Sequence, residues 1–179
     1  MPSNMKKYIL TSITLGVIAA SGALLIAGTN MLTRDTITKN EQKSINSGIA
    51  KIFGTSDTIT NESSLKEGEK YDYVITCYQV NDFNDSLLGY AFRTTGSNNY
   101  GKISLIVGFS KDSVYKGLSV VTNEQSFAST LKKNYIDLIK DGNQTINDVD
   151  VSCGATYGAK TVRAMVTEAE KALKDKLGA

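Results

Sequence analysis

Apolar positions form one long uninterrupted run near the start of the chain. Residues 8–33, YILTSITLGVIAASGALLIAGTNMLT, include no charged residue. As a helix with a rise of 1.5 Å per residue, this segment would extend about 39 Å, which exceeds a hydrocarbon core of about 30 Å. Lys6 and Lys7 precede it, so the positive-inside rule places the N-terminus in the cytoplasm and the rest of the chain outside. We therefore expect a single-pass anchor in the cell membrane.

Other N-terminal segments share part of this pattern. A cleaved signal peptide also begins with basic residues, but its apolar region is usually about 7–15 residues long. The sequence IAG near Ala27 is only a weak cleavage context. A lipoprotein signal requires a cysteine just after the apolar run, and a pilin-like stem requires an early glutamate; neither is present there. An uncleaved anchor is the interpretation that we adopt.

The hydrophobic period changes after the anchor. Ile37, Ile45, Ile49 and Ile52 follow helical spacing, and the polar stretch after Gly54 indicates a break and a loop. Segments rich in aromatic and β-branched residues follow and predict four strands. They cover residues 71–80, 87–95, 101–110 and 113–122. The short links between them favour antiparallel neighbours, because parallel strands need long crossovers.

Helical spacing returns in the last third of the chain. A first amphipathic pattern predicts a helix, because these apolar residues follow helical spacing: Phe127, Leu131, Tyr135, Leu138 and Ile139. Residues 144–151 are expected to form a short strand or an extended segment. A second pattern predicts a C-terminal helix that buries Val162, Met165, Val166, Ala169 and Leu173. The expected fold class is α+β, an N-terminal transmembrane helix followed by a twisted, mostly antiparallel sheet packed by helices.

This pattern predicts three parts of the chain. They are a cytoplasmic N-terminus with the anchor, a juxtamembrane helix with a loop, and a folded domain, at residues 1–34, 35–70 and 71–179. Hydrophobic residues make up 41% of the 179 residues and charged residues 21%, so most of the chain should fold. The folded domain is therefore the place to look for a functional site.

Charge and residue types exclude several kinds of function. A net charge of +2 is too small to indicate nucleic-acid binding. Histidine is absent, which removes the commonest acid–base group and a frequent metal ligand. Cys77 and Cys153 are far apart and form no metal-binding pair, so we expect no metal site. We expect Cys77 to be buried and Cys153 to be free, although a disulfide between them stays open.

One short stretch, DVSCGATYGAKTV at residues 150–162, carries candidate chemistry. The simplest interpretation makes Thr156 the N-cap of the C-terminal helix. In a second interpretation, the unpaired N–H groups of the first turn bind an anion such as a phosphate. Gly154 and Ala155 would leave room for a ligand, and Lys160 lies four residues after Thr156 on the same helix face. A covalent ester to the hydroxyl would retain such a ligand.

The second interpretation agrees with a known family. SCGAT, with Asp150 six residues before Thr156, resembles the flavinylation motif of the FMN-binding domains of the RnfG/NqrC family. The single anchor, the LLGYAF strand, the GKISLIVGFSKDSVYKGLSVV hairpin and the closing helix occur in the same order. The resemblance implies FMN joined to Thr156 by a phosphoester, which a flavin transferase forms from FAD. Asp150 would then belong to the sequence that the transferase recognises.

The sequence departs from the family's pattern at several positions. Cys153 stands where serine or threonine is usual, and Gly158 and Ala159 replace hydroxyl residues. The family's flavin-lining segment corresponds to EQSFAS at residues 124–129, where only Glu124 is retained.

The cofactor-binding set implied by the resemblance is Thr156, Cys153, Gly154, Ala155, Lys160, Glu124, Tyr100 and Gly101. Tyr157 could also lie near the cofactor or simply be exposed, whereas the helical spacing of Phe127 favours a place in the core.

By resemblance, the chain is expected to be an electron-carrier subunit of a membrane-bound, ion-translocating ferredoxin:NAD+ oxidoreductase, the Rnf complex. Its expected partners are the other membrane subunits, the flavin transferase during maturation and membrane lipid. No side-chain acid or base is required, because the flavin supplies the redox chemistry. Two alternatives stay open: a flavoprotein module of another extracytoplasmic electron-transfer chain, and an anchored binding or structural domain without a redox role.

Overall fold

A computed structural model describes residues 3–54, 59–65 and 68–178. The chain forms two compact units, residues 1–42 and 43–179. A single helix, α1 (Ser3–Phe53), supplies all that is described of the first unit and also the start of the second. The helix expected after the apolar run is confirmed, and it continues the apolar helix without a break at residue 34.

The part of α1 in the first unit has the surface of a lipid-facing helix. Every described side chain from residue 5 to residue 34 is exposed, although residues 8–33 carry no charge and most of them are apolar. Among the described residues, α1 is the one helix that is long and apolar enough to cross a membrane. The hydroxyls of four threonines donate to carbonyl oxygens four residues earlier, at 2.8–2.9 Å: Thr11, Thr14, Thr29 and Thr33. These bonds satisfy hydroxyl groups that lipid could not.

The second unit is built on an antiparallel sheet with the strand order β1-β2-β3-β4-β5. The strands are β1 (Ile59–Ser63), β2 (Val74–Asn81), β3 (Leu87–Asn98), β4 (Gly101–Ser110) and β5 (Tyr115–Asn123). Four of them confirm the predicted strands and their antiparallel arrangement. Between Gly54 and Lys70 the expectation of a loop was wrong at β1, which pairs with β2 from Ile59↔Asn81 to Ser63↔Cys77. Its polar sequence, ITNES, lacks the apolar alternation that would have identified a strand.

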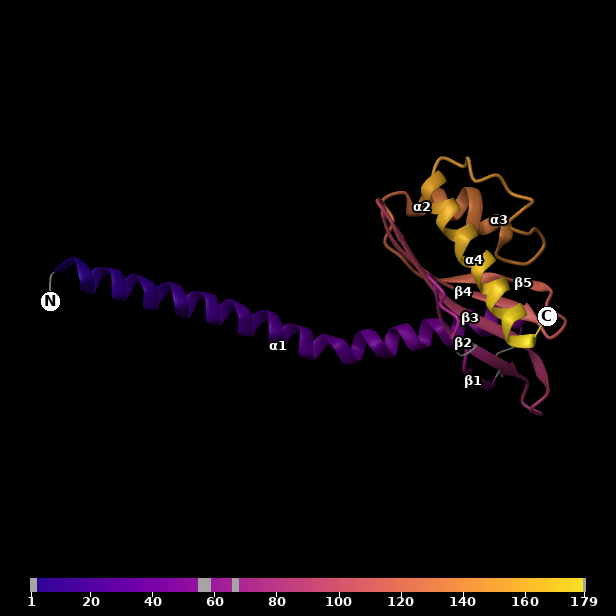
Figure 1. Ribbon diagram of the computed structural model, residues 1–179, viewed down its shortest axis with the longest axis horizontal. Helices are drawn as coiled ribbons and strands as arrows, with labels where there is room; N and C mark the ends of the chain where they lie inside the picture. Colours follow the sequence, from indigo (N-terminus) through magenta and orange to yellow (C-terminus); the bar gives the residue numbers. More distant parts are fainter. Residues whose placement is uncertain (1–2, 55–58, 66–67, 179) are drawn as a thin grey trace. The chain divides into compact units, whose positions relative to one another are not determined.

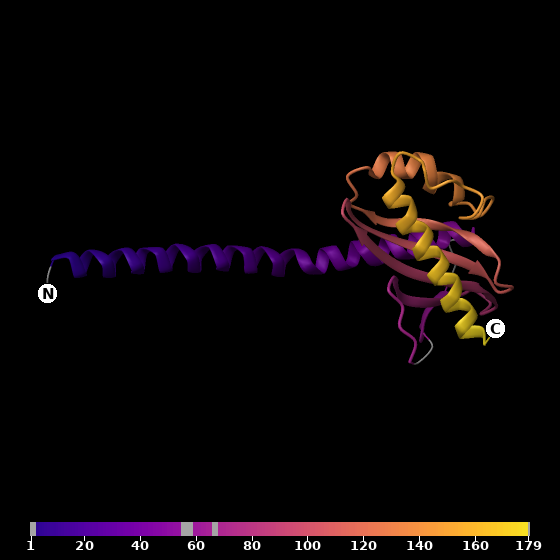
Figure 2. The same cartoon turned by 45° about the horizontal axis from the view of Figure 1, so that its top comes forward.

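Helices cover both faces of this sheet, so the sheet separates two hydrophobic cores. Alternate residues of β4 point to opposite sides: Leu105 and Val107 join one core, and Ile106 joins the other. The end of α1 contributes Ile45 and Ile49 to the smaller core. The remaining helices lie on the other face, where α4 (Thr156–Leu177) crosses the strands (Figures 1 and 2).

The segment before α4 is helical in three short pieces and then irregular. It consists of α2 (Ala128–Leu131), a π-helical turn η1 (Lys132–Ile136) and α3 (Asp137–Ile139). The predicted helix is therefore confirmed, but the strand or extended segment expected at residues 144–151 was wrong. Turns and bends replace it, and Ile146 and Val149 are nevertheless buried in the larger core. In this segment, apolar residues alternate with polar ones because Ile146 and Val149 fix a loop to the core, and not because the segment pairs with a strand.

Two features hold α4 close to the sheet. Gly96 in β3 has no side chain, and a Cβ atom there would lie 2.7 Å from Cγ2 of Thr161 and 2.9 Å from Sδ of Met165. The Glu168 carboxylate accepts hydrogen bonds from three consecutive backbone N–H groups just before and at the start of β2, at 2.7, 2.5 and 2.9 Å: those of Asp72, Tyr73 and Val74. One side chain therefore satisfies three backbone donors that would otherwise be unpaired. The contact at Gly96 fixes the distance between α4 and the sheet, and the Glu168 hydrogen bonds fix the position of α4 along its own axis.

Replacing Glu168 by alanine should lower the free energy of unfolding by about 2–3 kcal/mol, because three backbone donors lose a charged acceptor. The chain has nine tyrosines and no tryptophan, so urea unfolding is followed by tyrosine fluorescence. Thr167→Ala, at the exposed neighbouring position of α4, is the control and should change the value by less than about 0.5 kcal/mol. Equal stabilities for the two variants would contradict this role of Glu168.

Candidate functional site: the open N-terminus of helix α4

Helix α4 begins without a side-chain cap. The residue at its N-cap is Ala155 (φ −132°, ψ 46°), and Thr156 is the first residue of the helix. The interpretation of Thr156 as an N-cap is therefore wrong, because its hydroxyl lies one position too late to reach the orphan N–H groups. In the part of the chain that the structure describes, the Thr156 hydroxyl makes no hydrogen bond, and its side chain is half-buried.

The first backbone N–H groups of α4 are open as well. The N–H of Ala159 donates to the carbonyl of Ala155 at 3.0 Å, so the N–H groups of Thr156, Tyr157 and Gly158 precede the intrahelical ladder. With 22 residues, α4 is long enough to present a positive dipole end there. This terminus can bind an anion through its N–H groups.

A pocket of about 270 Å³ opens at this helix terminus. Its lining combines the first turn of α4 with the β3–β4 connection and the segment before α2. The lining residues are Tyr100, Gln125, Phe127, Gly154, Ala155, Thr156, Tyr157 and Gly158. Residues from three separate parts of the chain therefore meet beside the Thr156 hydroxyl.

Three aromatic rings gather around this pocket. The ring of Tyr100 lies 5.6 Å from that of Phe127 and 5.5 Å from that of Tyr157, centroid to centroid. All three side chains are exposed, by 39%, 50% and 59% respectively. Exposed aromatic surface next to an anion-binding helix terminus suits a ligand with both a planar ring and a phosphate.

Glycines allow the backbone segments around the pocket to approach closely. A Cβ atom at Gly158 would lie 2.8 Å from both Oε1 of Gln125 and Cδ2 of Leu131. At Gly101 (φ +131°), a Cβ atom would overlap the carbonyl oxygen of Glu124. Gly158 thus stands at a position where this structure leaves no room for a side chain.

Hydrogen bonds hold the loop that leads into α4. Arg163 donates from Nη2 to the carbonyl of Val149 at 2.6 Å, and Asn134 donates from Nδ2 to the carbonyl of Cys153 at 2.9 Å. The Asp150 carboxylate accepts the N–H of Ser152 at 3.0 Å. Gly154 follows with φ +84°, a left-handed conformation that favours glycine. The position of Thr156 is therefore set by a braced loop rather than by its own contacts.

The structure brings some of the expected site residues together and leaves others apart. Tyr100, Gly154, Ala155 and Thr156 line the pocket. The other expected residues do not line it: Gly101, Glu124, Cys153, Lys160 and Asp150. Of these, Gly101 and Glu124 support its wall through their backbones, whereas the side chains of Glu124, Lys160 and Asp150 are exposed. Cys153 packs against the edge of the larger core.

Gln125 was missed by the sequence analysis, and Phe127 was misassigned. The side chain of Gln125 is 7% exposed, donates to the carbonyl of Gly101 at 2.9 Å and forms the pocket wall. Phe127 was expected in the core, but its side chain is 50% exposed. Phe127 is the N-cap residue that precedes α2, so the helical spacing does not apply to it. The sequence did contain an indication for both residues, because they belong to the segment 124–129 that the resemblance places near the ligand.

The two cysteines are both free. Cys77 is fully buried in the larger core, and this burial raises the pKa of its thiol to about 11. Cys153 is partly exposed. A disulfide between them, left open by the sequence, is therefore not formed in this structure.

A long apolar helix followed by an α+β domain is the architecture of a membrane-anchored protein. Residues 1–51 match the family model described as the RnfG N-terminal region. The match covers 51 of the 179 residues, so it shows similarity to the RnfG family for this N-terminal segment. The matched region covers nearly all of α1 and ends before β1. A search of curated proteins found no match.

Alkylation of the native chain at neutral pH should modify Cys153 and spare Cys77. A thiol pKa of about 11 instead of 9.0 lowers the reactive thiolate of Cys77 roughly a hundredfold at neutral pH, and burial also excludes the reagent. Mass spectrometry after iodoacetamide treatment should find one modification in native protein and two in urea. Modification of Cys77 before Cys153 would show that the described core is wrong.

Proposed function

We propose that this chain is an electron-carrier subunit of an ion-translocating ferredoxin:NAD+ oxidoreductase complex and relays electrons through FMN joined by a phosphoester to Thr156. The observation that carries the proposal is the uncapped terminus of α4. There a half-buried threonine hydroxyl without an internal hydrogen bond lies beside open N–H groups and a pocket with three exposed aromatic rings. The family match at residues 1–51 supports the Rnf context, and that family is generally associated with flavin.

The residues present fit a flavin mononucleotide. The N–H groups of Tyr157 and Gly158 and the helix dipole suit the phosphate, since together they stabilise negative charge at a helix N-terminus. Tyr100, Phe127 and Tyr157 offer planar apolar surface for the ring system. At 270 Å³ and open to solvent, the pocket would enclose part of the ligand only.

Attachment would use the Thr156 hydroxyl as the acceptor. A flavin transferase would transfer the FMN phosphoryl group from FAD to Oγ1, so the hydroxyl proton is lost and AMP leaves. The braced loop presents this hydroxyl at the surface, with no internal hydrogen bond to break within the described residues. The exposed Asp150 is available to the transferase.

Bound FMN would supply reversible electron uptake and release. The protein would contribute position and electrostatics: the helix terminus holds the anionic end, and the aromatic rings hold the planar end. No side chain of this chain needs to act as an acid or base, and α1 carries no charged residue between residues 8 and 33 that could serve an ion path. Ion movement would therefore belong to other subunits of the complex.

Coexpression with an active flavin transferase tests the proposal. Wild-type chain should gain the mass of one FMN less one water, and Thr156→Ala should gain none. Thr156→Ser should still be modified, because it keeps the acceptor hydroxyl. In-gel flavin fluorescence should follow the same order.

Ser152→Ala is the matched control, since Ser152 is an exposed hydroxyl residue of the same loop. It should be flavinylated like the wild type. Unmodified wild type despite active transferase, or loss of FMN in Ser152→Ala but not in Thr156→Ala, would refute attachment at Thr156.

The proposal also places the folded unit on the extracytoplasmic side of the cell membrane, with α1 interacting with lipid. A cysteine introduced at Asp112, in the exposed β4–β5 turn, should react with a membrane-impermeant maleimide in intact cells when Cys153 is replaced by serine. The reason is that Lys6 and Lys7 keep the N-terminus in the cytoplasm. Labelling only after the membrane is permeabilised would reverse the proposed orientation.

A further inference from the structure

A second hollow of about 610 Å³ lies at the edge of the sheet beside β5, away from the Thr156 pocket. Its walls come from the end of α1, from β5 and from the η1–α3 segment, all within the unit of residues 43–179. These helical segments belong to the layers that cover the two opposite faces of the sheet. The hollow, here called the β5 groove, therefore lies where a sixth strand would extend the sheet.

The charged lining of the β5 groove is predominantly basic. It consists of Lys51, Lys116, Lys132, Lys140, Asp137 and Asp141. These four lysines and two aspartates give the groove a formal charge of +2, which equals the formal charge of the whole chain. The remainder of the chain is thus balanced, and the excess positive charge is concentrated at this edge.

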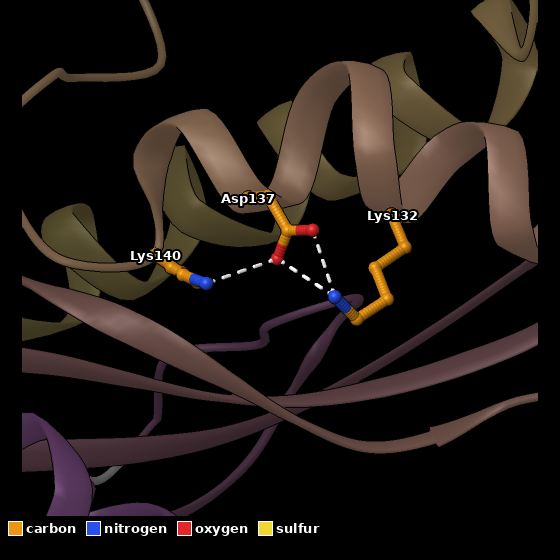
Figure 3. A network of polar contacts seen from close by, with 3 residues as sticks. All are labelled: Lys132, Asp137 and Lys140. Carbon is orange, nitrogen blue, oxygen red and sulfur yellow. Dashed lines mark hydrogen bonds and ion pairs between the residues drawn. The ribbon is translucent and has the colours of Figure 1, made fainter.

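The two walls of the β5 groove carry two lysines each but differ in net charge, because both aspartates lie on the same wall. On the η1–α3 wall, the Asp137 carboxylate binds Nζ of Lys132 at 2.7 Å and Nζ of Lys140 at 3.2 Å (Figure 3). The hydrogen bond from Lys132 keeps the pKa of Asp137 below its usual value, so this carboxylate stays charged. On the other side, Lys51 and Lys116 have no carboxylate partner in the described chain. Lys116 instead lies over the Phe53 ring, with Nζ 5.3 Å from its centroid.

Apolar side chains complete the lining of the groove. Ile52 from α1 and Val120 from β5 are half-buried there, whereas Leu118 and Ile136 are buried. A small anion would find two of the four ammonium groups already bound to a carboxylate. An extended acidic peptide suits this arrangement better, because its carboxylates can reach Lys51 and Lys116 while its backbone lies along β5.

The backbone of β5 offers hydrogen bonds in the groove. β5 is an edge strand of the sheet. The N–H of Leu118 points outward and donates to the carbonyl of Lys140 at 3.0 Å, so the chain covers the edge there. Val120 lies two residues further on and therefore presents its N–H on the same outer side. For this N–H the described residues provide no acceptor.

We propose that the β5 groove docks an extended segment of a partner protein, with acidic and apolar residues in alternation, which adds to the edge of β5 at Val120. Its carboxylates face Lys51 and Lys116, and its apolar side chains contact the half-buried Ile52 and Val120. This docking does not depend on flavin at Thr156.

Carbodiimide cross-linking in native membranes tests the proposal, since it joins a lysine amine directly to a neighbouring carboxylate. Lys51 and Lys116 should form cross-links to one acidic segment of another chain, identified by sequencing the linked peptides. Lys133 is the control, because it is exposed on η1 but does not line the groove. Linked peptides found equally at Lys133, or none at Lys51 and Lys116, overturn the proposal.

A defined probe separates strand addition from simple charge attraction. Full-length protein in nonionic detergent should bind a fluorescent eight-residue peptide that alternates glutamate and valine, measured by anisotropy at low salt. The double variant Lys51→Glu/Lys116→Glu should weaken binding about tenfold or more, while Lys133→Glu should change it less than about twofold.

The same peptide with N-methyl groups on alternate residues keeps its charge but loses the N–H groups of one edge. Of the two possible methylation registers, one should bind at least about tenfold more weakly than the unmodified peptide, because it cannot pair with β5. This comparison uses unaltered protein and does not depend on how a variant folds. No binding of the unmodified peptide, equal binding of both methylated forms, or full competition by inorganic phosphate overturns the proposal.

Discussion

The close contact between α4 and β3 is the constraint on which the rest of the folded unit depends. It is possible because Gly96 leaves a space that the side chains of Thr161 and Met165 fill. The Glu168 carboxylate, bound to three N–H groups around the start of β2, then prevents α4 from sliding along the sheet. Packing sets the distance of α4 from the sheet, and hydrogen bonding sets its position along its own axis. Together they determine where the N-terminus of α4 lies.

The candidate site follows from that position. The first turn of α4 meets the β3–β4 connection at Tyr100 and the segment before α2 at Phe127. Because no side chain caps the helix, its N–H groups and the Thr156 hydroxyl remain available to a ligand. An open terminus costs stability, since a capping side chain typically contributes about 1 kcal/mol. Such a local loss next to an aromatic pocket is typical of a functional site.

The two hollows of the folded unit differ in chemistry. The pocket at Thr156 combines aromatic surface with backbone N–H groups, which suits a planar ligand that carries a phosphate. The β5 groove combines lysine side chains with an open strand edge, which suits a peptide. Under the proposed function, the first surface would hold the cofactor and the second would bind a neighbouring chain.

Elements with strong hydrophobic periodicity could be predicted from the residue pattern alone. The uncharged run of residues 8–33, the four apolar strands and the amphipathic C-terminal helix were all predicted correctly, because burial or a lipid environment imposes a regular hydrophobic pattern. The hydroxyl at Thr156, its glycine neighbours and Tyr100 were also identified as candidates from the motif and its resemblance to a family.

The remaining features could be recognised only in the folded chain, because they depend on contacts between residues that are distant in the sequence. β1 is polar and is a strand only because β2 pairs with it. Gln125 and Phe127 join the pocket because α4 begins beside them. Thr156 is not the N-cap because it is already the first residue of the helix, and Ala155 holds the cap position. The β5 groove combines lysines from residues 51 to 140, and no local pattern could have placed them on one sheet edge.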